Sequence, residues 1–94
     1  MIDFLKDFLE QVKRVPDVAA VVDLGGKRRT SYQELEDISG RLAAWLKKQG
    51  ISTEDVVAIC VPRGMEFVAT RIAVMMVGAA WVGTEALMGK ERID

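Results

Sequence analysis

An unbroken apolar run at residues 56–61, VVAICV, constrains the fold more than any other feature of this chain. The run has the length of a strand, is rich in β-branched side chains, and shows no alternation with polar residues. Such a pattern is typical of a strand that is buried on both faces of a parallel sheet. Proline and glycine break the run at residues 62–64, and a nearly all-apolar stretch of helical length follows at residues 65–77. We therefore expect a strand, a buried helix that ends at Gly78, and a further strand at residues 79–83.

The first thirty residues predict a helix followed by a β-hairpin. Five apolar side chains recur on one face of the helix: Phe4, Leu5, Phe8, Leu9 and Val12. Pro16 ends this helix. Residues 18–24, VAAVVDL, form a short apolar run that predicts a strand. Gly25 and Gly26 then signal a tight turn, since both positions tolerate positive φ, and residues 27–30 are the expected return strand.

A capping box starts the next helix. In SYQE, Ser31 is followed three residues later by Glu34, so each side chain can satisfy a backbone amide that has no partner within the helix. The helix then places five apolar side chains on one side: Leu35, Ile38, Leu42, Trp45 and Leu46. Gly50 suits the position after the helix end.

The elements together predict an α/β fold. Their order is α-β-β-α-β-α-β, and the connections are short. We expect a mainly parallel sheet with an N-terminal β-hairpin, flanked by three helices, with right-handed crossovers. A chain of 94 residues makes one domain at most, so residues 1–94 are expected to form a single unit or part of one.

Composition excludes several classes of function. Thirteen basic and 14 acidic residues leave a net charge of −1, which predicts no nucleic-acid partner and no anionic membrane surface. The chain has one cysteine, Cys60, and no histidine, so an internal disulfide and Ser–His–Asp or Cys–His catalysis are excluded. The longest apolar stretch, residues 68–82, is too short to span a membrane. A lone thiol and an acidic start without signal-peptide features predict a cytoplasmic location.

The turn at residues 61–66, VPRGME, is the best local candidate for a ligand site. It lies where a parallel strand ends and a helix begins, a place where anions bind in α/β folds. Arg63 could hold a phosphate or carboxylate there, and the alternative is a solvated Arg63 or an ion pair with Glu66. Cys60 is expected to be a core residue of low reactivity, and Met75 and Met76 are expected to fill the core.

The other conspicuous residues have structural interpretations. Glu34 is explained by the capping box, the pair Glu54 and Asp55 by solvation, and the two glycines at 25–26 by the turn. Neither G-x-G-x-x-G after a strand nor G-x-x-x-x-G-K-S/T occurs. We therefore expect no catalytic, cofactor-binding or metal-binding residue in this chain.

Four segments resemble the N-terminal end of the AMP-forming adenylating enzymes, most closely the amino-acid adenylation domains of nonribosomal peptide synthetases. They are FLEQVKRVPDVAAVVD (8–23), TSYQEL (30–35), RLAAWLKKQGISTEDVVAICVPRGMEFV (41–68) and VMMVGAAWVG (74–83). The second is similar to the family's first core motif, with Thr30 in place of leucine. The fourth is similar to the second core motif, with Trp81 in place of tyrosine. Acyl-CoA ligases and D-alanine–carrier-protein ligases are relatives of this family.

The resemblance implies a scaffold segment of a ligase that uses ATP and Mg²⁺ to convert a carboxylic acid, in particular an amino acid, into an acyl-adenylate. The acyl group would pass to a thiol such as phosphopantetheine. In the family, the phosphate loop, the nucleotide and substrate pockets and the catalytic lysine come later, so we expect an inactive fragment whose partner is the remainder of the domain. The tail departs from the family pattern, because residues 83–89 lack three prolines that are usual there.

Two other functions stay open. An uncovered sheet edge and helix face would suit an interaction module, which self-associates or exchanges elements between copies. A small independent nucleotide-binding domain that uses Arg63 is the third, although its glycine signature is absent.

Overall fold

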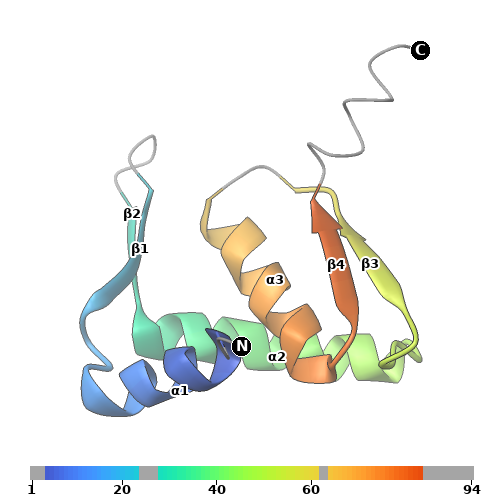
Figure 1. The fold of residues 1–94 in the computed structure, drawn as a ribbon. Helices are drawn as coiled ribbons and strands as arrows, with labels where there is room; N and C mark the ends of the chain where they lie inside the picture. Colours follow the sequence, from blue (N-terminus) through green and yellow to red (C-terminus); the bar gives the residue numbers. More distant parts are fainter. Residues whose placement is uncertain (1–3, 24–27, 62–63, 84–94) are drawn as a thin grey trace.

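The computed structural model describes residues 4–23, 28–61 and 64–83 (Figure 1). Three helices and four strands occur in this part of the chain, in the order that the sequence predicts. Their bounds are α1 Phe4–Arg14, β1 Ala19–Asp23, β2 Arg28–Ser31, α2 Tyr32–Lys48, β3 Val56–Ile59, α3 Met65–Val77 and β4 Ala80–Gly83. The expected turn at Gly25 and Gly26, Arg63, and residues 84–89 of the proline-poor tail lie outside the described residues.

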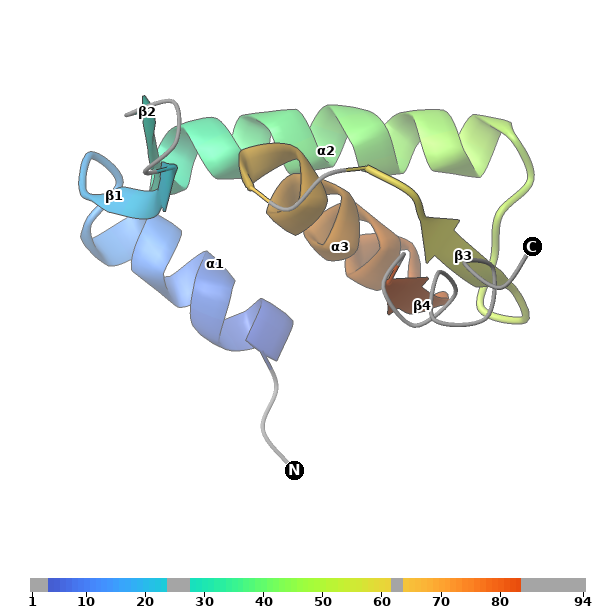
Figure 2. The ribbon, with the colours of Figure 1, turned by 90° about the horizontal axis from the view of Figure 1, so that it is seen from above.

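The strands form two separate pairs in the described residues. β1 and β2 are antiparallel, and β3 and β4 are parallel. The two pairs stand at opposite ends of α2, and α3 lies between them (Figures 1 and 2). The expected single, mainly parallel sheet is therefore wrong for this part of the chain. The reason is physical: a helix occupies the space through which the hairpin would have to reach β3 to continue the sheet.

Helix α2 starts and ends as its sequence predicts. The Ser31 amide donates to Oε1 of Glu34 at 2.8 Å, and the Glu34 amide donates to Oγ of Ser31 at 3.1 Å, which completes the capping box. At the other end, Gly50 has a φ of +88°. Its amide donates to the carbonyl of Lys47, and the amide of Ile51 donates to that of Leu46, which is the Schellman arrangement.

Two hydrophobic clusters hold the helices together. The first is built from Phe8, Val12, Leu35, Met65, Ala69 and Ile72. The second is built from Leu46, Ala73, Val74 and Ala79. Helix α3 contributes to both clusters, and α2 also does so, through Leu35 and Leu46. Helices α2 and α3 therefore form the centre of the fold, and the two strand pairs lie at opposite ends of α2.

Three residues of the predicted apolar helix faces lie at the surface. Leu9 is 36% exposed and Phe4 is 38% exposed on α1, and Trp45 is 56% exposed on α2. Helical periodicity finds the apolar side of a helix, but it does not say how much of that side a neighbour covers. In α2 the two ends of the apolar side, Leu35 and Leu46, are buried, so exposure differs between neighbouring positions of the same face.

Candidate functional site

The residues singled out from the sequence do not gather into one site. Glu34 completes the capping box with the N-cap residue Ser31, as expected. The Asp55 carboxylate accepts from the Ser52 amide at 2.7 Å, so Asp55 stabilises a turn, whereas Glu54 is exposed. Glu66 is exposed in the first turn of α3. Because Arg63 lies outside the described residues, its proposed pairing with Glu66 stays a prediction.

Cys60 is exposed, so the prediction that it lies in the core is wrong. It follows β3 directly, whereas its neighbour Ile59 is buried. Met76 packs against the first cluster, in agreement with a role in the core, and Met75 is half-buried.

One face of the parallel pair β3–β4 is largely exposed. Register places Val56 beside Ala80 and Ala58 beside Val82. Alternation along the strands puts these four side chains on one side of the pair. We call the set Val56, Ala58, Ala80 and Val82 the open face. Val56 is 68% exposed, both alanines are exposed, and Val82 is half-buried.

The opposite face of the same pair packs on α3. Trp81 meets Phe67 edge-on, with ring centroids 6.0 Å apart. A Cβ placed on Gly83 would lie 3.4 Å from the Phe67 ring, and Val57 packs against the second cluster. The apolar run 56–61 therefore has a covered side and an open side, although its composition predicts burial on both.

Arg71 lies between two aromatic rings at the junction of α1, α3 and β4. Its guanidinium carbon is 4.7 Å from the centroid of the Phe4 ring and 5.2 Å from that of Trp81. The Nε atom is buried and has no hydrogen-bond partner in the described part of the chain. Stacking on two rings stabilises the half-buried cation of Arg71 within the largely apolar helix α3. Sequence reasoning missed this role, although a lone cation in an apolar helix is a signal for it.

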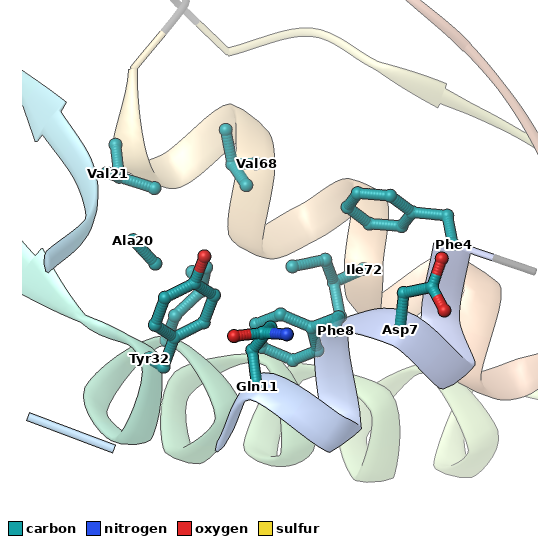
Figure 3. Close-up of a pocket in the computed structure, with 10 residues that line it drawn as sticks. Phe4, Asp7, Phe8, Gln11, Ala20, Val21, Tyr32, Val68 and Ile72 are labelled. Carbon is teal, nitrogen blue, oxygen red and sulfur yellow. The ribbon is translucent and has the colours of Figure 1, made fainter. Parts of the chain in front are cut away.

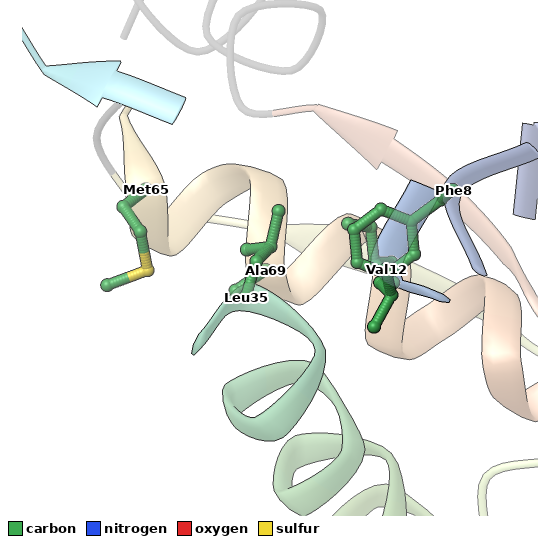
Figure 4. Close-up of a cluster of buried hydrophobic side chains, with 6 residues drawn as sticks. Phe8, Val12, Leu35, Met65 and Ala69 are labelled. Carbon is green, nitrogen blue, oxygen red and sulfur yellow. The ribbon is translucent and has the colours of Figure 1, made fainter. Parts of the chain in front are cut away.

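A pocket of about 250 Å³ opens between α1, the hairpin and α3 (Figure 3). Its walls are mostly apolar, and polar groups of Asp7, Gln11 and Tyr32 lie among them. Phe8 and Leu35 belong both to this wall and to the first cluster (Figure 4). The pocket is thus a gap beside the core, and no sequence motif points to it.

The described residues offer no metal site, since no three His, Cys, Asp or Glu side chains converge among them. None of the three described helices combines the length and the apolarity needed to cross a bilayer. The geometry that stands out is therefore a surface for packing and not a set of reactive groups.

Nearly the whole chain is similar to proteins of one known family. The sequence profile of the AMP-binding enzyme family matches residues 8–94. Malpinin synthetase of Mortierella alpina is 37% identical over 86 residues, which is 92% of this chain and 1% of that protein. Gramicidin S synthase 2 of Brevibacillus brevis is 34% identical over 87 residues, which is 93% of this chain and 2% of that protein.

Solved structures show the same fold. The NpsA N-terminal subdomain of Klebsiella oxytoca, in complex with anthranilyl-AMSN, superimposes with a TM-score of 0.77 at 32% identity, over 84% of this chain and 20% of that one. A luciferase-like enzyme of Zophobas morio has a TM-score of 0.78 at 24% identity, which shows a shared fold. This chain thus spans only a small part of the length of each relative: 1–2% of the two synthetases, 20% of the NpsA chain and 23% of the luciferase-like enzyme. With nearly all its residues matched by the family profile, the chain belongs to the AMP-binding enzyme family.

Proposed function

We propose that this chain is the N-terminal scaffold segment of an ATP-dependent, AMP-forming ligase. The whole enzyme activates a carboxylic acid, in particular an amino acid, as an acyl-adenylate and transfers the acyl group to a thiol. The observation that carries this proposal is the family match over residues 8–94, together with the shared fold of the NpsA subdomain.

The architecture supports a structural role. Helices α2 and α3 make the core, and the parallel pair β3–β4 is attached at one end with one face open. In the whole enzyme, β3 and β4 belong to a larger, mainly parallel sheet, which the remainder of the domain completes. The remainder of the adenylation domain is thus the partner of this segment.

ATP and Mg²⁺ would bind elsewhere in the enzyme, and phosphopantetheine is the thiol we expect as acyl acceptor. Among the described residues, no three potential metal ligands come together. Stabilising the charge of a transferring phosphoryl or adenylyl group takes converging donors or metal ions. We accordingly expect the isolated chain to be catalytically silent, and its lone cysteine suits a reducing, cytoplasmic setting.

A chimera tests the proposal. In the fused NpsA–ThdA adenylation–carrier chain, the segment that this chain matches is replaced by this chain. ATP–pyrophosphate exchange is then measured with anthranilate, since an NpsA structure contains anthranilyl-AMSN. The matched control is the same NpsA–ThdA chain with the segment deleted.

We expect exchange from the chimera, none from the deletion control and none from the isolated chain. Exchange by the isolated chain would contradict the scaffold role. A folded chimera that is as silent as the deletion control would also contradict it.

The open face also favours a second candidate function, an interaction module that associates with itself. Sedimentation of the isolated chain over a range of concentrations separates the two. A concentration-dependent dimer supports the module, and a monomer at all concentrations supports the scaffold.

A further inference from the structure

The pocket between α1, the hairpin and α3 has an apolar interior and a polar mouth (Figure 3). The buried side chains of Phe8, Leu35 and Ile72 form its inner wall. Asp7 is exposed and Gln11 is half-buried, so their polar groups lie where the pocket opens to solvent. We call this space the α1 pocket. It offers apolar contact together with a fixed place for a polar group, a combination that is typical of small-molecule sites.

The volume of the α1 pocket limits the size of its ligand. It measures about 250 Å³. An apolar cavity of about 150 Å³ is large enough to bind benzene, whereas pockets for drug-sized ligands start at about 300 Å³. A molecule with one or two fused rings therefore fits the α1 pocket by volume.

Aromatic side chains in the wall favour a flat ring as that molecule. Phe4, Phe8 and Tyr32 all line the pocket. The rings of Phe8 and Tyr32 have centroids 6.1 Å apart and planes inclined by 42°. A ligand ring beside them can make the edge-on or offset contacts that aromatic rings prefer. The Tyr32 hydroxyl points into the space between β1 and α3 (Figure 3) and makes no hydrogen bond within the described residues, so it is available to a polar atom of the ligand ring.

The charge at the mouth decides which flat molecule is favoured. Of the ten described residues that line the α1 pocket, Asp7 alone is charged. Gln11 follows it by one helical turn, so the two side chains lie on the same side of α1. An ammonium group has three donors and no acceptor, so it can donate to oxygens of both side chains. The Arg71 cation stacks on the Phe4 ring at 4.7 Å and does not line the pocket, so a ligand carboxylate would meet repulsion from Asp7 without a cation in the wall.

We propose that the α1 pocket binds an aromatic amine, with its ring among Phe8, Tyr32 and Val68 and its ammonium group at the carboxylate of Asp7. This ligand site is additional to the proposed function and does not rest on it. A bound ring contacts α1, β1 and α3 at once, because the pocket is lined by residues of all three elements. Binding should therefore stabilise the attachment of α1 to the rest of the chain.

Three compounds with the same indole ring test the role of charge. Tryptamine ends in an ammonium group, 3-ethylindole is neutral, and indole-3-propionate ends in a carboxylate. Each is titrated into the chain, and nitrogen–proton correlation NMR spectra report the affinity, the place of binding and the folded state together. We expect shifts at residues of the α1 pocket, with a dissociation constant of about 0.1–1 mM for tryptamine. The other two compounds should bind at least about threefold more weakly.

Removing the charge of Asp7 tests its contact with the ligand. Asp7→Asn keeps the size of the side chain, and we expect tryptamine to bind at least about threefold more weakly to this variant. The affinity for 3-ethylindole should stay the same. Glu10→Gln is the matched control, because Glu10 is exposed on α1 and does not line the pocket. It should leave the affinity for tryptamine nearly unchanged.

Filling the α1 pocket tests the place of the ring. Ala20→Ile puts a larger, β-branched side chain into the pocket from β1, and tryptamine should then cause no shifts at the pocket residues. Ala19→Ile is the matched control, since Ala19 is the preceding residue of β1 and does not line the pocket. Tryptamine should bind to this control as it does to the unmodified chain.

Each other outcome would overturn the inference. Equal affinities for the three indoles would mean that the pocket does not select an amine, and tighter binding of indole-3-propionate would mean that it selects an acid. A folded Asp7→Asn or Ala20→Ile variant that binds tryptamine as well as the unmodified chain does would place the ligand elsewhere. A folded chain without shifts at the pocket residues in millimolar tryptamine would show that the pocket binds no such ligand.

Discussion

Gly78 shows how a single residue controls the passage from α3 to β4. Its φ of +92° lies in the left-handed region, and its amide donates to the carbonyls of Met75 and Val74 at 3.0 and 3.1 Å. A Cβ at this position would lie 2.9 Å from Cγ2 of Thr53. Backbone strain and a steric clash therefore both oppose a side chain at Gly78.

A glycine series separates these two effects. Gly50→Ala should lower the free energy of unfolding by about 1–2 kcal/mol, because φ is +88° there but the space is open. Gly78→Ala should cost more, because the contact with Thr53 is added. Gly40→Ala should instead stabilise α2 by about 0.5–1 kcal/mol, since helical alanine is favoured and nothing lies within 4 Å. Urea denaturation measures all three.

The clash at Gly78 can be relieved separately. Thr53→Ser removes the Cγ2 methyl group and should recover part of the loss in Gly78→Ala. If Gly50→Ala and Gly78→Ala lower the free energy of unfolding equally, and Thr53→Ser recovers nothing, the contact with Thr53 does not contribute to the cost at Gly78.

The capping box gives a second residue-level prediction. Ser31→Ala removes the acceptor for the Glu34 amide and should lower the free energy of unfolding by about 1 kcal/mol. Glu34→Gln keeps an oxygen that can accept from the Ser31 amide, so it should cost less than Glu34→Ala. Thermal unfolding followed by circular dichroism measures the three variants, and equal losses for both Glu34 changes would argue against a capping role for that side chain.

At the scale of elements, Arg71 connects three parts of the chain. It belongs to α3, and its guanidinium lies over Phe4 of α1 and Trp81 of β4. The N-terminal end of α1 adds to the packing of the molecule through this stack, although Phe4 remains 38% exposed. Helix α1 thus packs on the first cluster through Phe8 and Val12, and contacts Arg71 through Phe4.

Removing the charge of Arg71 should weaken this connection. Arg71→Met keeps an apolar stem but loses the attraction to both rings, and we expect a loss of about 1 kcal/mol. A double-mutant cycle with Phe4→Leu, followed by urea denaturation, should give a positive coupling between the two residues. Additive effects of the two changes would show that the stack contributes nothing.

At the scale of the whole molecule, packing is uneven. Ile72 in α3 is fully buried at the centre of the first cluster, whereas Val56 on the open face is 68% exposed. A chain of this size has a stability of only about 5–15 kcal/mol. The loss of stability caused by shortening a side chain should thus depend on how deeply that side chain is buried, and not on the residue type alone.

Ile72→Ala should lower the free energy of unfolding of the isolated chain by about 2–5 kcal/mol, which can unfold it. Val56→Ala should change it by less than about 0.5 kcal/mol, because little of that side chain is buried. Chemical denaturation of both variants checks this contrast. A large loss for Val56→Ala would show that the open face is already covered in the isolated chain.

Local signals predicted the elements well. The box at Ser31 and Glu34 and the glycines at 50 and 78 act within a few residues of the backbone, so their effects can be read without knowing the fold. Burial was predicted less well. Cys60 and Trp45 belong to apolar patterns, and whether such a pattern is covered depends on segments far away in the chain.

The amino-acid sequence by itself determined the order and ends of the helices and strands, and its motifs resembled those of the family, because caps, turns and periodicity depend on neighbouring residues. Only the tertiary structure decided that the strands divide into two pairs with α3 between them, that Arg71 stacks on two rings, and that one face of β3–β4 is open. These features depend on which surfaces meet in space, and packing of that kind is settled by the whole set of contacts at once.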